Sequence, residues 1–145
     1  TPTIFNLIYK LAVYEKLEND VITTVEELRT NIFEKNYAEV IIAEEDEKPV
    51  GFALYFHNFS TFVGKPGIYL EDLFVEPEMR GKGYGKALLV ELAKIAKERN
   101  CGRLEWSVLD WNTPSIEFYK SLGAKPMDEW TVFRLNKEGI ENLAK

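Results

Sequence analysis

A glycine-rich, basic segment lies directly before an apolar helical stretch, and it limits what this chain can form more than any other feature. The segment reads Arg80-Gly81-Lys82-Gly83-Tyr84-Gly85-Lys86. Glycine loses more conformational freedom than any other residue when it is ordered, so this cluster indicates that the backbone itself has a role there. After it, apolar residues such as Leu88 and Leu92 recur on one face of a helix, which Asn100 and Gly102 end.

Helices and strands precede and follow this central helix. Thr1-Pro2 and a periodic apolar face predict a first helix, and the capping box Thr24-Val25-Glu26-Glu27 predicts a second, shorter one. β-branched and aromatic runs predict strands over 39–43, 50–56, 68–75, 104–109 and 130–135. A polar turn over 45–49 joins the first two strands into a hairpin, and the stretch 60–67 is predicted to be a loop.

A further helix begins at Asn112 and ends at Gly123, and a short polar helical tail follows the last strand. The order is helix, helix, three strands, helix, strand, helix, strand. That order predicts a mixed α/β sheet. With 145 residues and no repeat or linker, residues 1–145 are expected to form a single domain.

Composition excludes several classes of protein. The net charge of −6 argues against a nucleic-acid binder, which needs a broad basic face. The longest apolar runs, such as 40–43, are too short to span a bilayer, and no signal-like segment opens the chain. A single cysteine, Cys101, fits a reducing cytoplasm, and one cysteine with one histidine argues against a metal site. We therefore expect a cytoplasmic protein without a nucleic-acid partner, a membrane partner or a metal.

The glycine-rich segment has the chemistry of an anion-binding turn. The first N–H groups of a helix have no internal partners and carry the positive end of its dipole. Glycines let anionic oxygens approach these groups, and Arg80, Lys82 and Lys86 add cations. The spacing is neither that of a P-loop nor that of the dinucleotide fingerprint. On these grounds alone, a flexible basic surface turn explains the segment equally well.

Two motifs together resemble a known family. Arg80-x-x-Gly83-x-Gly85, between "YLEDLFVEPEMRG" and an Ala/Leu-rich helix, resembles the pyrophosphate loop of the GCN5-related N-acetyltransferases (GNAT). "VLDWNTPSIEFYKSLGA" supplies the second motif, with a strand, Asn-x-x-Ser and a helix ending in Phe-Tyr-Lys-x-x-Gly-Ala. The resemblance covers Ile4 to the tail. It implies the GNAT fold, a mixed, mostly antiparallel sheet with flanking helices and a splayed-strand acetyl-CoA cleft. Family members usually begin with a strand, whereas this chain starts at the helix, so either the sequence is truncated there or that edge of the sheet is built differently.

Within the family, "LAVYEKLEND", "GIYLEDLFV" and "EFYKSLGA" look most like the diamine acetyltransferases, which include spermidine/spermine and thialysine enzymes. "FSTF" and "VLDWN" are similar to the thialysine branch, whereas the polyamine branch usually carries an acid where Ser60 stands. The resemblance implies acetyl-CoA as co-substrate, a small primary amine as acceptor, direct transfer in a ternary complex, and a homodimer.

The resemblance also implies coenzyme contacts. The pantetheine arm would pair with the backbone of Leu73, Phe74 and Val75, although core packing explains their side chains as well. The pyrophosphate would bind Arg80, Gly81, Lys82, Gly83, Tyr84, Gly85 and Lys86. Asn112 and Ser115 are predicted to cap the next helix and to touch the coenzyme, and capping alone accounts for both.

Tyr119 and Glu71 are the predicted catalytic residues. The Tyr119 phenol matches the family's general acid, which protonates the departing thiolate. A base is required because a primary amine with a pKa of about 10.4 is almost wholly protonated at neutral pH. Glu71 and Asp72 are expected to face opposite sides of a strand, which leaves Glu71 towards the cleft. A solvated edge carboxylate is the alternative for Glu71.

Tyr14 and Glu15 match the residues that hold the distal cation of the substrate, together with Glu71. Asp128 and Trp130 are weaker candidates for the same end, and an exposed helix end explains Tyr14 and Glu15 equally well. Two other functions stay open. One is acetylation of a protein N-terminus or lysine, and the other is non-catalytic binding of coenzyme A.

Overall fold

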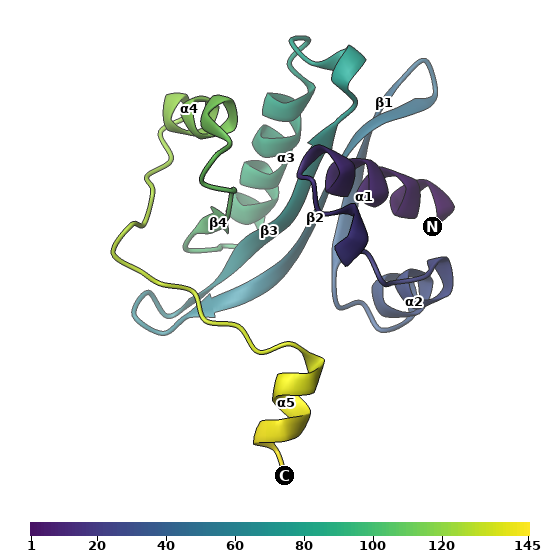
Figure 1. Ribbon diagram of the computed structural model, residues 1–145. Coiled ribbons are helices and arrows are strands. Elements are labelled where there is room, and N and C mark those ends of the chain that lie inside the picture. Colours follow the sequence, from purple (N-terminus) through teal and green to yellow (C-terminus); the bar gives the residue numbers. More distant parts are fainter. The chain divides into compact units, whose positions relative to one another are not determined.

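The computed structural model describes all residues from Thr1 to Lys145, and its contacts divide them into two units, 1–107 and 108–145 (Figure 1). The first unit is a four-stranded sheet with helices, and the predicted mixed α/β sheet is confirmed. Its elements, in chain order, are α1 (Pro2–Tyr14), a 3-10 turn η1 (Glu18–Asp20), α2 (Val25–Arg29), a π-helical turn η2 (Thr30–Glu34), β1 (Glu39–Glu45), β2 (Lys48–Ser60), β3 (Lys65–Val75), a second 3-10 turn η3 (Pro77–Met79), α3 (Tyr84–Glu98) and β4 (Leu104–Trp106).

The strands lie in the order β1-β2-β3-β4. The pairs β1–β2 and β2–β3 are antiparallel, and β3–β4 is parallel, with α3 forming the crossover between them. β4 pairs only with Ile68–Leu70 of β3. From Glu71 to Val75, β3 therefore continues without a sheet neighbour on that side.

One face of the sheet packs against α1. Ile4, Leu7 and Leu11 lie on one side of this helix because their spacing follows the helical period. They form a buried cluster with Ile32, Phe52, Leu54 and Phe74. Since successive residues of a strand point to opposite faces, the alternation in β2 places Phe52 and Leu54 on this face.

Strand residues that point to the other face of the sheet pack against α3. Leu88, Leu89 and Leu92 are the buried residues of this helix, and Ala53, Tyr55 and Ile68 are buried among the strands. α3 contacts β1, β2, β3 and β4. This helix follows the glycine-rich segment, so its packing fixes where that segment lies relative to β3.

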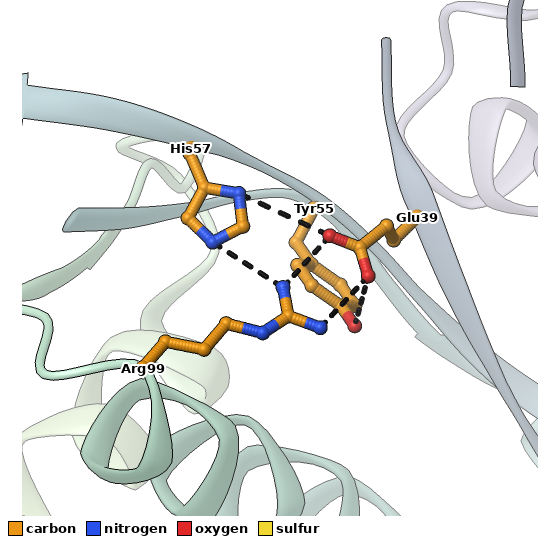
Figure 2. Close-up of polar contacts among 4 residues, drawn as sticks. All are labelled: Glu39, Tyr55, His57 and Arg99. Atoms are coloured by element: carbon orange, nitrogen blue, oxygen red, sulfur yellow. Dashed lines mark hydrogen bonds and ion pairs between the residues drawn. The ribbon is translucent and has the colours of Figure 1, made fainter. Parts of the chain in front are cut away.

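The C-terminal end of α3 is held to the sheet by a polar cluster (Figure 2). The cluster consists of Glu39, Tyr55, His57 and Arg99. Arg99 follows the last turn of α3, whereas Glu39 begins β1 and the other two residues lie on β2. Tyr55 donates its hydroxyl to Glu39 Oε1 at 3.5 Å. His57 Nε2 lies 3.3 Å from Arg99 Nη1, and His57 Nδ1 lies 3.9 Å from Glu39 Oε2. This accounts for the only histidine in the chain.

The hairpins differ in detail from expectation. β2 extends to Ser60 and β3 starts at Lys65, so the predicted 60–67 loop is largely a tight turn. Ser60 Oγ accepts from the Val63 N–H at 3.2 Å, and the Ser60 carbonyl accepts from the Gly64 N–H at 2.8 Å. These bonds close the turn early, which lets both strands lengthen. In the first hairpin, Asp46 and Glu47 have φ values of 52° and 67°, as a two-residue turn requires.

The second unit contains α4 (Thr113–Ser121) and α5 (Lys137–Leu143). The strand predicted over 130–135 does not form, and Trp130 and Phe133 are 74% and 91% exposed. A strand needs a neighbour to satisfy its backbone, and this unit has no other strand. β4 is likewise shorter than predicted, ending at Trp106 rather than at residue 109. None of the helices is both long enough and apolar enough to cross a membrane.

Candidate functional site

The unpaired edge of β3 is the first component of the site. The Glu76 N–H donates to the Val50 carbonyl at 2.7 Å. Because antiparallel bonding alternates along a strand, the main-chain groups of Val75 and Leu73 point away from β2, towards the open edge. Phe74, between them, is only 4% exposed and belongs to the core. The strand can therefore use one residue for packing and its neighbours for backbone pairing with an extended ligand.

The glycine-rich turn is the second component. Gly81 and Gly83 have φ values of 84° and 87°, which L-residues rarely adopt, and an added Cβ would meet nothing within 4 Å. Conformation, and not lack of space, therefore requires these two glycines. Gly83 is the N-cap of α3 and makes no side-chain capping bond. No capping side chain therefore covers the first N–H groups of α3, as an anion-binding turn requires.

Gly85 lies in the first turn of α3, beside the end of β3. The atom nearest to a Cβ added there is Val75 Cγ2, at 3.9 Å. The missing side chain keeps the space between the helix start and the strand end open. Tyr84 is half-buried and Lys86 exposed at the same helix start.

Two cations of the turn have partners inside the protein. Arg80 Nε donates to the Val75 carbonyl at 3.0 Å, and its Cζ lies 4.6 Å from the centroid of the Tyr14 ring. Lys82 Nζ lies 3.6 Å from Glu45 Oε2, and burial together with the nearby Glu45 carboxylate raises the pKa of Tyr84. The acidic turn between β1 and β2 thus lies against the basic turn that precedes α3.

A β-bulge is the third component. Leu70 pairs with Tyr55 and Asp72 with Leu54, so Glu71 is an extra residue without a partner on β2. This residue interrupts the alternation on which the choice of Glu71 over Asp72 depended. The strand pattern therefore no longer separates the roles of the two carboxylates.

The two carboxylates have different surroundings. Glu71 is exposed, whereas Asp72 is half-buried. Burial, followed by the nearby charges of Glu71 and Glu15, raises the pKa of Asp72 to about 7. Burial also raises the pKa of Glu15. Asp72 is the residue that sequence reasoning missed, because nothing in the sequence marks the bulge.

The end of α1 reaches the same region. Tyr14 is the last residue of α1 and Glu15 its C-cap, and both are half-buried. The structure brings Tyr14, predicted at the amine end, against Arg80, predicted at the coenzyme end. It also brings Glu15 within electrostatic reach of Asp72.

The second unit carries the remaining predicted residues. Asn112 Oδ1 accepts from the Ser115 N–H at 3.4 Å, which confirms the predicted cap of α4. Tyr119 is half-buried in α4, and its ring centroid lies 5.7 Å from that of Phe118. Asp128 and Trp130 are exposed in the irregular segment between α4 and α5.

These components have a clear chemical capacity. An open strand edge can pair with the amides of an extended ligand, and the glycine-rich turn can bind phosphate. Asp72, with its raised pKa, can accept a proton near neutral pH. No group of three or more His, Cys, Asp or Glu side chains is arranged to hold a metal ion.

Comparisons with known proteins agree with this arrangement. Residues 5–124 match the family model described as "Acetyltransferase (GNAT) family". A thialysine N-epsilon-acetyltransferase of Bos taurus is 39% identical over 97% of this chain and 89% of its own length. An L-ornithine N5-acetyltransferase of Arabidopsis thaliana is 42% identical over 66% of this chain, which spans 42% of that relative.

A solved structure has the same fold. An integron cassette protein from the mobile metagenome of V. cholerae superimposes with a TM-score of 0.79 at 34% identity. The match covers 94% of this chain and 86% of that one. The α/β fold, with its mixed four-stranded sheet and flanking helices, therefore recurs in a related protein.

Proposed function

Because this chain belongs to the GNAT acetyltransferase family, we propose that it transfers the acetyl group of acetyl-CoA to a primary amine of a small cationic substrate. The chain is an N-acetyltransferase that acts on amines. The substrate class and the roles of individual residues are the finer part of the proposal. A thialysine-like amino acid is the first candidate, and diamines and polyamines follow.

The observation that carries the proposal is the open edge of β3 beside the glycine-rich turn. These features fit an acyl-CoA, which supplies the thioester. Main-chain groups of Leu73 and Val75 would pair with pantetheine amides, on either side of the buried Phe74. The turn from Arg80 to Lys86 would bind the pyrophosphate. Asn112 and Ser115 are proposed as further coenzyme contacts.

Acidic residues support a cationic substrate. Glu15, Glu71 and Asp72 interact electrostatically near the end of α1. A substrate ammonium would offset the repulsion among them. Tyr14 and Glu15 would hold the distal cation, and Asp128 and Trp130 are weaker candidates for that end.

Ser60 favours an amino acid over a polyamine. Its side chain is 5% exposed, and its Oγ accepts the Val63 N–H. That position therefore offers no negative charge to a second substrate cation. Two relatives also bear names that specify an amino acid with a terminal amine, thialysine or ornithine.

Transfer requires proton movements at the nitrogen and at the sulfur. The amine nitrogen bonds to the acetyl carbon and the carbon–sulfur bond breaks, with both substrates bound at once. Glu71 takes the proton that the ammonium loses before attack, directly or through a water. The Tyr119 phenol gives a proton to the leaving thiolate and regains one from the attacking nitrogen, which keeps a single hydrogen in the amide product. A main-chain N–H near Val75 would polarise the thioester carbonyl.

Asp72 is a second candidate for the base. It is half-buried beside Glu71, and its pKa of about 7 lies near the operating pH. A base is most effective when its pKa lies near the operating pH. Glu71 would then hold the substrate ammonium instead.

A cytoplasmic homodimer is proposed from the family alone.

A panel of amines tests the function. Thiol release from acetyl-CoA is measured with thialysine, lysine, ornithine, diamines, spermidine and basic peptides at equal concentration. We expect the largest kcat/KM with thialysine or ornithine. Turnover with peptides alone would refute a small-amine substrate. Binding of coenzyme A without turnover on any amine would instead favour a non-catalytic coenzyme-binding module.

A further inference from the structure

Arg80 is held by groups from two separate parts of the first unit. Its Nε donates to the Val75 carbonyl at 3.0 Å. Its guanidinium carbon lies 4.6 Å from the Tyr14 ring centroid and 5.7 Å from that of Phe74. The side chain thus folds back over the strand end and the end of α1, although it is exposed to solvent.

Both partners of Arg80 have other roles in the proposed function, on which this inference rests. The Val75 carbonyl lies on the open edge of β3, where a pantetheine amide would donate. Tyr14 lies at the end where the amine would bind. Arg80 therefore contacts one group of the proposed coenzyme site, the Val75 carbonyl, and one group of the proposed amine site, the Tyr14 ring.

A diphosphate would compete well for this guanidinium. Hydrogen bonds between Arg and phosphate oxygens are charge-assisted and often bidentate, so they are stronger than one bond to a carbonyl and an aromatic contact. Arg80 directly precedes the turn that would receive the diphosphate, and the guanidinium is solvent-accessible. It can be captured without rearrangement of the core.

We propose that Tyr14 is a positioning residue, which holds Arg80 over the Val75 carbonyl until the diphosphate of the coenzyme draws the guanidinium away. The movement frees the Val75 carbonyl for pantetheine and the Tyr14 ring for the amine. By linkage, each ligand therefore raises the affinity of the protein for the other.

Lys10 provides a control within the same helix. Its Nζ lies 2.8 Å from Glu76 Oε2, so α1 has a second contact with the segment after β3. Tyr14→Leu removes the aromatic face, Tyr14→Phe keeps it, and Lys10→Met weakens the docking of α1 without touching Arg80. A purely structural role of the α1 end predicts similar losses in Tyr14→Leu and Lys10→Met.

Titration calorimetry with coenzyme A measures the effect. A cation–π contact at an exposed site corresponds to about a 2- to 5-fold change in an equilibrium constant. Tyr14→Leu is expected to bind coenzyme A more tightly by about that factor, whereas Tyr14→Phe and Lys10→Met should match the parent protein. Unchanged or weaker binding in Tyr14→Leu would overturn the proposal.

Two measurements on the parent protein complete the test, in case Tyr14→Leu does not fold. Saturating coenzyme A should lower the Kd of thialysine by about 2- to 5-fold, and a ratio near one would contradict the proposed coupling. The Arg80 Nε–H resonance, assigned with Arg80→Lys, should move with coenzyme A but not with pantetheine, which lacks the diphosphate. The same shift with pantetheine would refute the proposal that the diphosphate draws Arg80 away. A protein that binds no coenzyme A at all would instead refute the proposed function.

Discussion

Arg99 binds Glu39 through two parallel hydrogen bonds, from Nη1 to Oε2 at 2.8 Å and from Nη2 to Oε1 at 3.0 Å (Figure 2). This pair joins the end of α3 to the first residue of β1. Bidentate Arg–carboxylate pairs are the strongest of the partly exposed ion pairs. The pair therefore stabilises the packing of α3 on the sheet.

Arg99→Ala is expected to lower the free energy of unfolding by about 1 kcal/mol at pH 7. The hydrogen bond from Arg99 is the main cause that lowers the pKa of Glu39, against the opposing effect of burial. A lowered carboxyl pKa gives stability that is present above about pH 4.5 and lost as pH falls through the folded-state value. Urea unfolding at pH 7 and at pH 3 should show a larger loss at the higher pH.

Arg29→Ala is the matched control for that experiment. Arg29 pairs with Glu26 and Glu34 within neighbouring turns of the chain and joins no distant elements. Its removal should change the free energy of unfolding much less than Arg99→Ala does, because solvent screens these exposed pairs. Equal effects of the two substitutions would contradict a special role of the Arg99–Glu39 pair.

Asp72→Asn is expected to stabilise the protein above neutral pH. Burial raises the pKa of Asp72 to about 7, so the folded state favours the protonated form. The contribution of this group to stability is complete below about pH 4 and is lost as pH rises through about 7. The gain of the variant should grow across that range and reach about 2 kcal/mol at pH 8. Thermal unfolding at pH 4 and pH 8 measures it.

Glu71→Gln serves as the comparison, because Glu71 is exposed next to Asp72. It should change stability at pH 8 much less. If Asp72 is the base, Asp72→Asn should also remove the rise of kcat/KM near pH 7. A pH profile that keeps this rise in Asp72→Asn would leave Glu71 as the base.

Tyr119→Phe is expected to reduce kcat by about 100-fold or more, since it removes the proposed proton donor to sulfur. The affinity for coenzyme A should stay within about 2-fold of the parent value, because the ring is retained in α4. Steady-state kinetics and calorimetry provide the two readouts. Unchanged turnover would remove Tyr119 from the acid role.

Glu45→Gln is expected to tighten coenzyme A binding by about 2-fold at low salt. Glu45 lies 3.6 Å from Lys82 and would compete with phosphate for that cation. Glu47→Gln removes the same charge from the same turn without contacting Lys82, so it is the matched control. An equal gain in both variants would show that only the net charge of the turn matters.

Much of the fold follows from local patterns in the sequence. Apolar spacing predicted α1 and α3, and Asn112 predicted the start of α4, because caps and helical faces depend on nearby residues. The strand expected over 130–135 did not form, since a strand also depends on a partner elsewhere in the chain. Whether residues 1–145 behave as one domain stays a prediction.

In the candidate site, too, local features could be predicted from the sequence, whereas features that depend on distant segments could not. The sequence predicted a role for the backbone of the glycine-rich segment, and Gly81 and Gly83 have positive φ values that other residues rarely adopt. The bulge at Glu71 arises from pairing with β2, which strict alternation cannot predict. The contacts of Arg80 with Tyr14 and of Lys82 with Glu45 could not be predicted either, because they join residues far apart in the sequence.

The flank of β3 that no strand covers has a further consequence for handling the protein. Apart from the Val75 carbonyl, which Arg80 occupies, its outward main-chain groups have no strand partner, and such flanks pair with strands of other molecules and promote self-association. An occupying coenzyme would cap this flank as well as deliver its acetyl group. Preparations without coenzyme should therefore aggregate when they are concentrated, and coenzyme added during purification should reduce this aggregation.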